Sequence, residues 1–413
     1  MIERCFKSPS IVQRLRGGAA GPFLDGFAES VCAVGYSSET SGSYLQAADH
    51  LGRWAERCGV AIADLDEDLL ARFVRHLPRC WCDSYTGRGY KRVPFRVRAF
   101  LRYLREAGVV RKPAPEAVCS SLVTEYGAWM RDRRGLAATT IAQSVPVVEA
   151  LLATVGEDLT GLDAASVRRF VLEYCQQHAP SSAGCVTTIV RCFLRWLIAQ
   201  ARCPTDLVEA VPKLPTWRMV KLPRYLPDAD VERILEACDR PSSVARRDRA
   251  MLLLLARLGL RAGDVLALRL GDFDWELGRL RVVGKGRRET RLPLPQDAGD
   301  AILAYLAAER PAAATDHVFL TARPPIRPIR LSALRDVVGR AIERAGVRAP
   351  SRGTHVLRHS LATRMLREGA TLDAIGAVLR HRDVTTTALY AKVDVNLLRQ
   401  VAQPWPEAEV SSC

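Results

Sequence analysis

The sequence feature that most constrains the fold is a repeat within the first half of the chain. A series of amphipathic helical patterns spans residues 24–104, and the same series returns in the same order over residues 122–197. The two copies close on similar segments, 98–104 and 191–197, which both contain Phe-Leu-Arg, an aromatic residue and Leu. Apolar residues at i, i+3 and i+4 occur in any helical bundle, but the shared order favours duplication of one unit. We therefore expect two small all-α bundles without strands.

Proline-rich segments mark the joints of the chain. Pro113 and Pro115 separate the two copies of the repeat, and four prolines fall in the segment 212–227. Proline lacks a backbone N–H and disfavours helix in the residue before it, so this segment is expected to be an extended linker.

The pattern changes after this linker. Asp228 is expected to cap a helix, and residues 246–268 are expected to form two helices broken at 258–260. Two runs of alternating apolar and polar residues, 279–283 and 290–294, flank a glycine-rich basic turn, which predicts a β-hairpin. Further helices are expected over 297–308, 331–345, 355–368 and 372–379.

Lysine and arginine exceed aspartate and glutamate by 60 to 45, which gives a formal net charge of +15. This excess predicts a polyanionic partner but does not separate DNA, RNA and a membrane surface. Arginine accounts for 53 of the 60 basic residues; its planar guanidinium suits phosphate, although genome base composition produces the same bias. No segment approaches the roughly 20 apolar residues that cross a bilayer, and no apolar signal segment follows Met1. A cytoplasmic protein is therefore expected.

Twelve cysteines in a chain of 413 residues do not indicate a disulfide framework. Cys80 and Cys82 form a Cys-x-Cys pair, but the Cys and His spacing typical of a zinc site is missing. Most cysteines are expected to be small core residues of a reduced, cytosolic protein, and no metal site is predicted. Four histidines have no partner by spacing and are expected to be surface or core residues: His50, His76, His178 and His317.

Reactive side chains gather in four segments of the second half. These side chains are Arg261 at a helix corner, Lys285 in the hairpin turn, His355 and Arg358 on one helix face, and His381 followed by Tyr390. Two arginines can clamp the oxygens of a phosphodiester as charge develops. A lysine can protonate a leaving oxygen, and a histidine can take the proton of an attacking phenol. Because Walker A, HExxH and paired-carboxylate motifs are all missing from the sequence, the set suits phosphoryl transfer without a metal or ATP.

These segments resemble the tyrosine recombinases of the phage integrase family. The resemblance rests on LGLRAGDVLALRLGDFDW (258–275), VVGKGRRETRLPL (282–294), HVLRHSLATRML (355–366) and LRHRDVTTTALYAKV (379–393). It implies that Tyr390 is the nucleophile, which forms a 3′-phosphotyrosyl bond and frees a 5′-hydroxyl. It assigns the other roles as follows: Arg261 and Arg358 bind the phosphate, Lys285 is the general acid, His355 is the acid/base partner of the tyrosine, and His381 contacts the scissile phosphate.

The resemblance implies a mainly α fold with a small β-sheet, in which tandem all-α SAM-like core-binding bundles precede a mixed α+β catalytic domain. The expected parts are an N-terminal helical DNA-binding domain (1–112), a helical core-binding domain (116–206), a proline-rich linker (207–227), the catalytic domain (228–400) and a C-terminal tail (401–413). The last helical domain and the catalytic domain would form a clamp around duplex DNA. The tandem duplication departs from the family, in which one core-binding domain is normal.

Two further departures lie within the motifs. Asp264 stands where the family usually has Glu, and it is expected to support the site without reacting. Arg380 replaces the glycine that precedes the family's second histidine; a left-handed backbone there is strained for arginine, which puts the pose of His381 in question. His359 is expected to point away from the face that carries Arg358 and to be structural.

Arginines outside the catalytic set are candidate DNA contacts. A basic helix over 88–105 with interleaved aromatic residues is expected to follow a phosphate backbone. The candidates are Arg92, Arg96, Arg98, Arg102, Arg191, Arg195, Arg287 and Arg288.

These observations predict a cofactor-free, site-specific DNA recombinase of the integrase or mobile-element transposase type. Its expected partners are duplex DNA with a specific recombination site and further subunits, in a homotetramer or a hetero-oligomer with related recombinases. The expected location is the bacterial cytoplasm, at the nucleoid and not at a membrane. Two alternatives are a catalytically inert DNA-binding protein of the same fold and a DNA-relaxing enzyme of the type IB topoisomerase kind. The complete set of reactive positions argues against the first, and the tandem helical repeats argue against the second.

Overall fold

The structure is a computed structural model that describes residues 1–80, 92–111, 120–178, 182–213, 222–238, 242, 244–284, 289–381 and 383–393. Helices predominate among these residues, and their strands form a three-stranded sheet. The expected mainly α fold with a small sheet is therefore confirmed. Residues 111–218 form a compact unit of their own.

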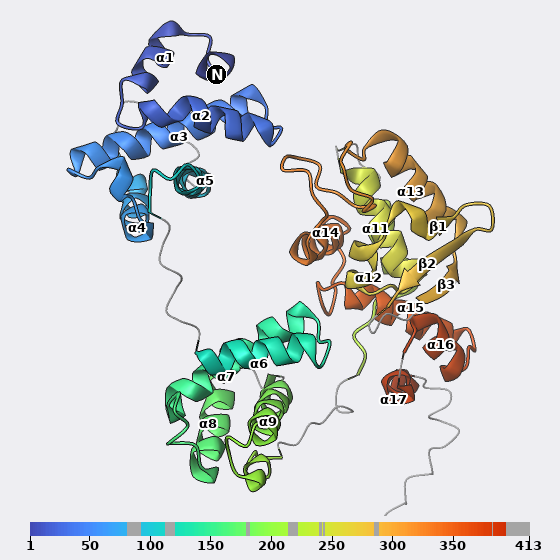
Figure 1. Ribbon diagram of the computed structural model, residues 1–413. Coiled ribbons are helices and arrows are strands. Elements are labelled where there is room, and N and C mark those ends of the chain that lie inside the picture. Colours follow the sequence, from blue (N-terminus) through green and yellow to red (C-terminus); the bar gives the residue numbers. More distant parts are fainter. Residues whose placement is uncertain are drawn as a thin grey trace, which may run out of the picture. The chain divides into compact units, whose positions relative to one another are not determined.

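The first helical bundle packs around large apolar side chains. Leu51, Phe73 and Leu104 come from three of its helices and are fully buried. Asp66 begins one of these helices by accepting the backbone N–H of Leu69 at 2.8 Å. The elements are α1 (Pro9–Arg16), α2 (Gly21–Ala33), α3 (Ser38–Arg57), α4 (Glu67–His76) and α5 (Val93–Glu106), with the 3-10 helices η1 (Ile2–Arg4), η2 (Ile62–Asp64) and η3 (Leu77–Arg79) (Figure 1).

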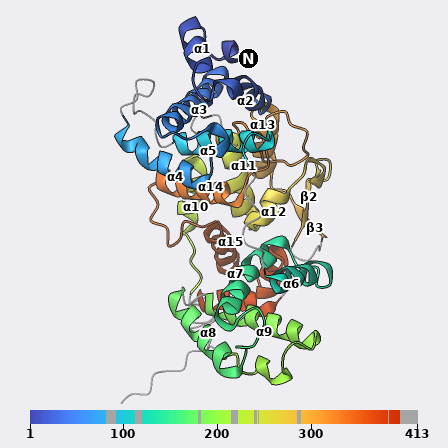
Figure 2. The same cartoon turned by 60° about the vertical axis from the view of Figure 1, so that its left-hand side comes forward.

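The second bundle is built in the same way. Leu151, Phe170 and Phe193 are buried in its core, and Asp163 begins α8 by accepting the backbone N–H of Ser166 at 2.7 Å. Its elements are α6 (Ser121–Asp132), α7 (Ala138–Val155), α8 (Ala164–Gln177), α9 (Ala183–Ala199) and the 3-10 helix η6 (Thr205–Val208). The neighbouring helices α8 and α9 are seen side by side in Figure 2.

Equivalent aromatic contacts occur in the two copies of the repeat. In the first bundle, the ring centroids of Phe27 in α2 and Phe100 in α5 are 5.0 Å apart. In the second bundle, Tyr126 in α6 and Phe193 in α9 hold the matching positions, with centroids 5.1 Å apart. Each pair joins the first helix of the repeat to its last, which gives the shared closing segment a packing role. As expected, the described residues of both copies contain no strand.

Helix α7 is long and apolar enough to cross a membrane, by length and composition alone. It spans 18 residues with a mean hydropathy of 1.4, so the expectation that no segment approaches this length is wrong for α7. Buried Val148, Leu151 and Leu152 place one face of the helix in the core of the second bundle. Packing in this core accounts for the apolar face.

The C-terminal body is built around α11 (Ala245–Arg257). Met251, Leu252, Leu254 and Leu255 of this helix are fully buried, and α13 and α15 pack against it (Figure 1). The other helices are α10 (Asp228–Glu236), α12 (Ala262–Ala267), α13 (Gln296–Ala308), α14 (Leu331–Arg344), α15 (His355–Arg367), α16 (Leu372–Leu379) and α17 (Val384–Ala388), with the 3-10 helices η7 (Leu270–Asp272) and η8 (Leu389–Val393).

The sheet of this body is antiparallel, with the strand order β1-β2-β3. Its strands are β1 (Phe273–Asp274), β2 (Arg279–Val283) and β3 (Glu289–Pro293). Leu280 pairs with Leu292, and both side chains are buried, so the predicted hairpin is confirmed, with the second strand shifted by one residue. Strand β1 escaped prediction because two residues produce no periodicity.

Two local predictions need correction. The break predicted at 258–260 does separate α11 from α12, but Asp228 does not cap α10. Pro227 holds the N-cap position and Asp228 is the first helical residue, where its negative charge still suits the helix dipole. The cysteines are also less buried than predicted: among those described, only Cys238 is buried. Several of the others are half-buried and pack against the bundle cores.

Candidate active site

Two arginines enter the site from different helices. Arg261 lies directly before α12, and Arg358 is on the first turn of α15. Arg358 is 4% exposed, and its guanidinium donates to the carbonyl oxygens of Gly259 and Leu379. These bonds tie α15 to the corner between α11 and α12 and to the end of α16. They leave further guanidinium donors for an anion.

The corner between α11 and α12 requires glycine. Gly259 has a φ of +57°, in the left-handed region that favours glycine. A Cβ atom there would lie 2.7 Å from Leu379 Cδ2 and 2.9 Å from Leu361 Cδ2, which is closer than side chains pack. Because position 259 is glycine, the corner lies close enough to α15 and α16 for the Arg358 guanidinium to bond to the Gly259 carbonyl oxygen.

The two motif departures form one ion pair. Arg380 follows α16 with φ +55° and ψ +48°, so the expected left-handed strain is present. Its guanidinium donates to the carboxylate of Asp264 at 2.7 Å, and both side chains are 8% exposed. The same carboxylate accepts the backbone N–H of Arg261 at 3.2 Å, and the Arg380 carbonyl accepts from the Arg261 guanidinium at 3.2 Å. The pair therefore offsets the strain and positions Arg261.

Tyr390 is buried beside two histidines. It lies in η8 and is 1% exposed. Its hydroxyl oxygen is 2.8 Å from His359 Nδ1, and its ring is parallel to that of His381 with centroids 6.4 Å apart. Burial raises the pKa of Tyr390 to about 12, although the positive charge of Arg358 acts in the opposite direction. The phenol is therefore protonated at neutral pH and needs a base before it can attack.

His359, which was expected to be structural, contacts the side chain of Tyr390. Its ring centroid is 6.3 Å from that of His355, and its Nδ1 atom is 2.8 Å from the hydroxyl oxygen of Tyr390 in η8. Helix geometry alone cannot show a partner from another element. Burial, followed by the charges of His355 and Arg358, lowers the pKa of His359 to about 4. The available signal was a second histidine one helical turn after His355.

His381 keeps a defined pose despite the left-handed residue before it. Its Nδ1 atom is 2.8 Å from the Oγ1 atom of Thr387, and the Thr387 side chain is buried. Burial, then the charges of Arg358 and Arg261, lowers the pKa of His381 to about 4. The ring is thus neutral at neutral pH, and its Nε2 atom remains for another partner.

Positive charge accumulates where Arg261, Arg358 and Arg380 meet, and Asp264 is the acidic group hydrogen-bonded there. Burial and the charge of Arg261 lower the pKa of Arg358 to about 10, which leaves it protonated at neutral pH. Desolvation, then the charges of Arg358 and Arg261, lowers the pKa of His355. The excess of cationic groups thus helps to lower the pKa of both Arg358 and His355, and a bound anion would offset that excess.

The structure brings five of the six predicted catalytic residues to these neighbouring elements: Arg261, His355, Arg358, His381 and Tyr390. The sixth, Lys285, lies outside the described residues, and so do Arg287 and Arg288. The strands that flank this turn end at Val283 and begin at Glu289.

Exposed residues form a stripe along α5 of the first bundle, which we call the α5 stripe: Arg92 at the N-cap, then Phe95, Arg98 and Arg102. Steps of three or four residues place them on one helix face. The Phe95 side chain is 62% exposed. Arg96 lies off the stripe, with its guanidinium carbon 6.0 Å from the centroid of the Tyr44 ring.

The two candidate arginines of α9 differ in their surroundings. Arg195 is exposed. Arg191 Nη2 donates to the carbonyl oxygens of Val211 and Pro212, at 3.0 Å each. Arg191 therefore holds the segment after η6 against α9, and its role as a DNA contact stays a prediction.

Two histidines for which spacing predicted no partner do have neighbours. His50, His76 and Cys80 bring metal-binding atoms within 4.8 Å of one another. His50 is buried in the core, as predicted. The two histidines come from separate elements, α3 and the end of α4, so linear spacing does not reveal that they meet.

The model of the phage integrase family matches residues 224–396. A Sinorhizobium fredii protein named integrase/recombinase y4rA is 37% identical over 403 residues, covering 94% of this chain and 95% of that protein. The structure of the XerH site-specific recombinase in a post-cleavage complex with palindromic difH substrate has a TM-score of 0.56 at 20% identity, covering 84% of this chain and 98% of that chain. The structure of a lambda integrase tetramer bound to a Holliday junction has a TM-score of 0.50 at 18% identity. The match covers 73% of this chain and 86% of the integrase chain. The solved structures are similar to this chain in fold.

Replacing Asp264 by Asn should destabilise the C-terminal body by about 3–5 kcal/mol, because the buried charge of Arg380 loses its counter-ion. Adding Arg380→Gly should recover most of this loss, since it removes both the unpaired charge and the left-handed strain. Hydrogen exchange of the α16 amides in the full chain measures both effects. Asp336→Asn, at an exposed position of α14, is the control and should exchange as the wild type does. Equal exchange in the single and double variants would show that Asp264 and Arg380 are not coupled.

Proposed function

The chain belongs to the phage integrase family of tyrosine recombinases, and we propose that it is a site-specific recombinase that cuts and rejoins duplex DNA through a 3′-phosphotyrosyl bond. The observation that carries this proposal is the meeting of a cationic centre, Arg261 and Arg358, with the histidine-bonded phenol of Tyr390. Transfer of a DNA phosphoryl group to tyrosine requires an anion site beside an activated phenol.

Arg261 and Arg358 bind the scissile phosphodiester in this mechanism. Their N–H groups contact the non-bridging oxygens and stabilise the charge that develops there. The carbonyl bonds of Arg358 hold its guanidinium in place before DNA arrives. His381 contributes one more donor: with Nδ1 accepting from Thr387, its Nε2 carries the proton toward the phosphate.

The proton of Tyr390 passes first to His359. The 2.8 Å separation of the hydroxyl and Nδ1 is within reach of proton transfer. Without DNA, burial and neighbouring cations keep the pKa of His359 at about 4, so it is a weak base. The negative phosphodiester offsets those cations and raises this pKa, which couples activation of the nucleophile to substrate binding. His355, exposed one turn earlier on α15, relays the proton to solvent.

The phenolate oxygen then bonds to phosphorus while the bond to the 5′-oxygen breaks. Because Tyr390 is 1% exposed, η8 must move for its hydroxyl to meet the phosphodiester. Lys285 protonates the departing oxygen, which leaves as a 5′-hydroxyl. The phosphotyrosyl bond keeps the energy of the phosphodiester, so attack by another 5′-hydroxyl rejoins the DNA without ATP or a metal ion.

DNA binding is assigned to both helical bundles as well as to the catalytic domain. In this scheme 1–112 and 116–206 are DNA-binding domains, and 207–227 links them to the catalytic domain 228–400. The α5 stripe presents cations and an exposed aromatic ring, a combination that suits a phosphate backbone. A tetramer on DNA, of this chain alone or with related recombinases, follows the lambda integrase assembly. Its location is the cytoplasm, at the nucleoid.

A nicked suicide substrate of the cognate site tests the nucleophile. In EDTA the wild-type protein should form a covalent protein–DNA band, because loss of the short nicked strand prevents rejoining. Tyr390→Phe should form none, and Tyr174→Phe, on α8 of the second bundle, is the matched control. Failure of the wild type to form the band with its true site would contradict the mechanism.

The role of His359 is tested by the pH dependence of single-turnover cleavage. In the wild type, the rate should rise with pH as the histidine loses its proton and then level off, at a pH above the pKa of about 4 found without DNA. His359→Asn retains a polar group near the hydroxyl but not the base. It should cleave about 100-fold more slowly and lack that inflection, whereas His178→Asn should behave as the wild type. An unchanged profile in His359→Asn would place the proton acceptor elsewhere.

The α5 stripe is tested by the salt dependence of DNA affinity. When the logarithm of DNA affinity is plotted against the logarithm of salt concentration, each phosphate contact adds about −0.9 to the slope. Arg98→Ala with Arg102→Ala should therefore flatten the slope by about 2, as measured by fluorescence anisotropy in a series of KCl concentrations. Arg75→Ala, an exposed arginine of α4 in the same bundle, is the control. An unchanged slope would remove the stripe from the DNA interface.

A further inference from the structure

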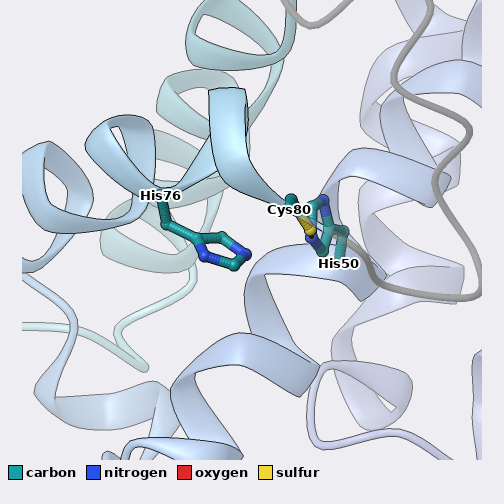
Figure 3. A group of neighbouring side chains, drawn as sticks. All are labelled: His50, His76 and Cys80. Carbon is teal, nitrogen blue, oxygen red and sulfur yellow. Dashed lines mark hydrogen bonds between the residues drawn. The ribbon is translucent and has the colours of Figure 1, made fainter.

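The first bundle gathers three metal-binding side chains from separate elements. His50 lies in the middle of α3, His76 is the last residue of α4, and Cys80 directly follows η3. One donor atom of each residue lies within 4.8 Å of the others, and His50 Nε2 is 3.1 Å from Cys80 Sγ. Figure 3 shows the imidazole of His76 pointing toward the other two side chains.

These separations suit one tetrahedral ion. With Zn–N bonds of about 2.0–2.1 Å and Zn–S bonds of about 2.3 Å, the ligand atoms around zinc lie roughly 3.3–3.6 Å apart. The observed range, from 3.1 Å for one pair to at most 4.8 Å, brackets these values. Small side-chain rotations therefore bring all three donors onto a common centre.

The donor set selects the metal. Two imidazole nitrogens and one thiolate suit zinc, whereas magnesium, calcium and manganese prefer oxygen ligands. We propose that His50, His76 and Cys80 bind a zinc ion that stabilises the first bundle. Within the described part of the chain, these side chains supply three of the four ligands of a tetrahedral ion.

The local structure holds the three ligands in place. His76 and Cys80 are four residues apart, and Pro78 in the intervening turn restricts the backbone between them. His50 is 1% exposed, and its ring packs edge-on against Phe73 with centroids 5.1 Å apart. The site is thus built on two helices and a short turn. Cys82 lies outside the described residues.

A hydrogen bond between His50 and Cys80 inside an aromatic cluster is the simpler interpretation. Trp54 and Phe73 do pack in this region, with ring centroids 5.5 Å apart. The His76 ring also packs in this cluster, with its centroid 6.2 Å from that of Phe73 and 6.4 Å from that of Trp54. Ring packing does not require the donor atoms of three side chains to converge, however. His76 lies with its ring centroid 6.0 Å from that of His50, and the convergence of all three donors favours the metal.

Zinc at this position links α3 to the turn after α4. Because such a site does not exist in the unfolded chain, metal binding favours the folded bundle. The role is structural and separate from the proposed cleavage of DNA, so tests of metal content do not depend on recombinase activity.

The experiment uses the full chain, purified with a phosphine reductant that keeps the thiol reduced. Elemental analysis should find one zinc per chain. After removal of zinc with a chelator, titration with Co²⁺ should produce the thiolate-to-cobalt charge-transfer band and the visible bands of a tetrahedral site, and added Zn²⁺ should abolish them. Zinc should also raise the thermal midpoint of the chelator-treated protein as its concentration increases.

Ligand variants separate this site from adventitious binding. Cys80→Ser should lose the charge-transfer band, and His76→Gln, at the end of α4, should weaken the affinity for Co²⁺ roughly 100-fold or more. Cys58→Ser and His178→Gln, both at exposed positions, should bind as the wild type. Circular dichroism confirms that the variants are folded, and the wild-type titration does not depend on any variant. Wild-type protein without zinc and without the cobalt bands, or Cys80→Ser with unchanged bands, would overturn the proposal.

Discussion

The arrangement of the candidate active site depends on the buried guanidinium of Arg358. Its bonds to the carbonyl oxygens of Gly259 and Leu379 join the first turn of α15 to two segments that are distant in sequence. A buried charge is costly unless hydrogen bonds and opposite charge surround it. Here carbonyl dipoles supply part of that compensation, and Gly259 makes it possible because any Cβ would meet the leucines of α15 and α16. The corner, the two helices and the arginine therefore form one unit.

The electrostatics of the site follow from this arrangement. Arg261 and Arg380 lie near Arg358, and the carboxylate of Asp264 bonds to two of the three arginines, through the Arg261 backbone and the Arg380 side chain. Burial and the surplus of positive charge hold the pKa of His359 and of His381 at about 4. A polyanion relieves that surplus, so the site is better matched to a DNA phosphate than to a neutral ligand. The net charge of +15 is consistent with such a partner.

Local patterns predicted the regular elements well because they depend on near neighbours. Helical periodicity located the repeated bundles, and alternation located the hairpin of β2 and β3. Two contacts that were not predicted have a common cause. His359 meets Tyr390 across 31 residues, and Arg191 is bonded to carbonyls 20 and 21 residues away. Such contacts depend on how elements pack, which periodicity does not describe.

The linear order of the chain was sufficient for the fold class, the reactive motifs and their resemblance to one family, because residue types and short spacings carry that information. Packing alone revealed that Asp264 and Arg380, two separate departures from the motif, compensate each other in a buried pair. It also brought His50, His76 and Cys80 together. Both groupings join residues on different elements, and their distances are set by helix packing, a property of the whole body that no local stretch of sequence contains.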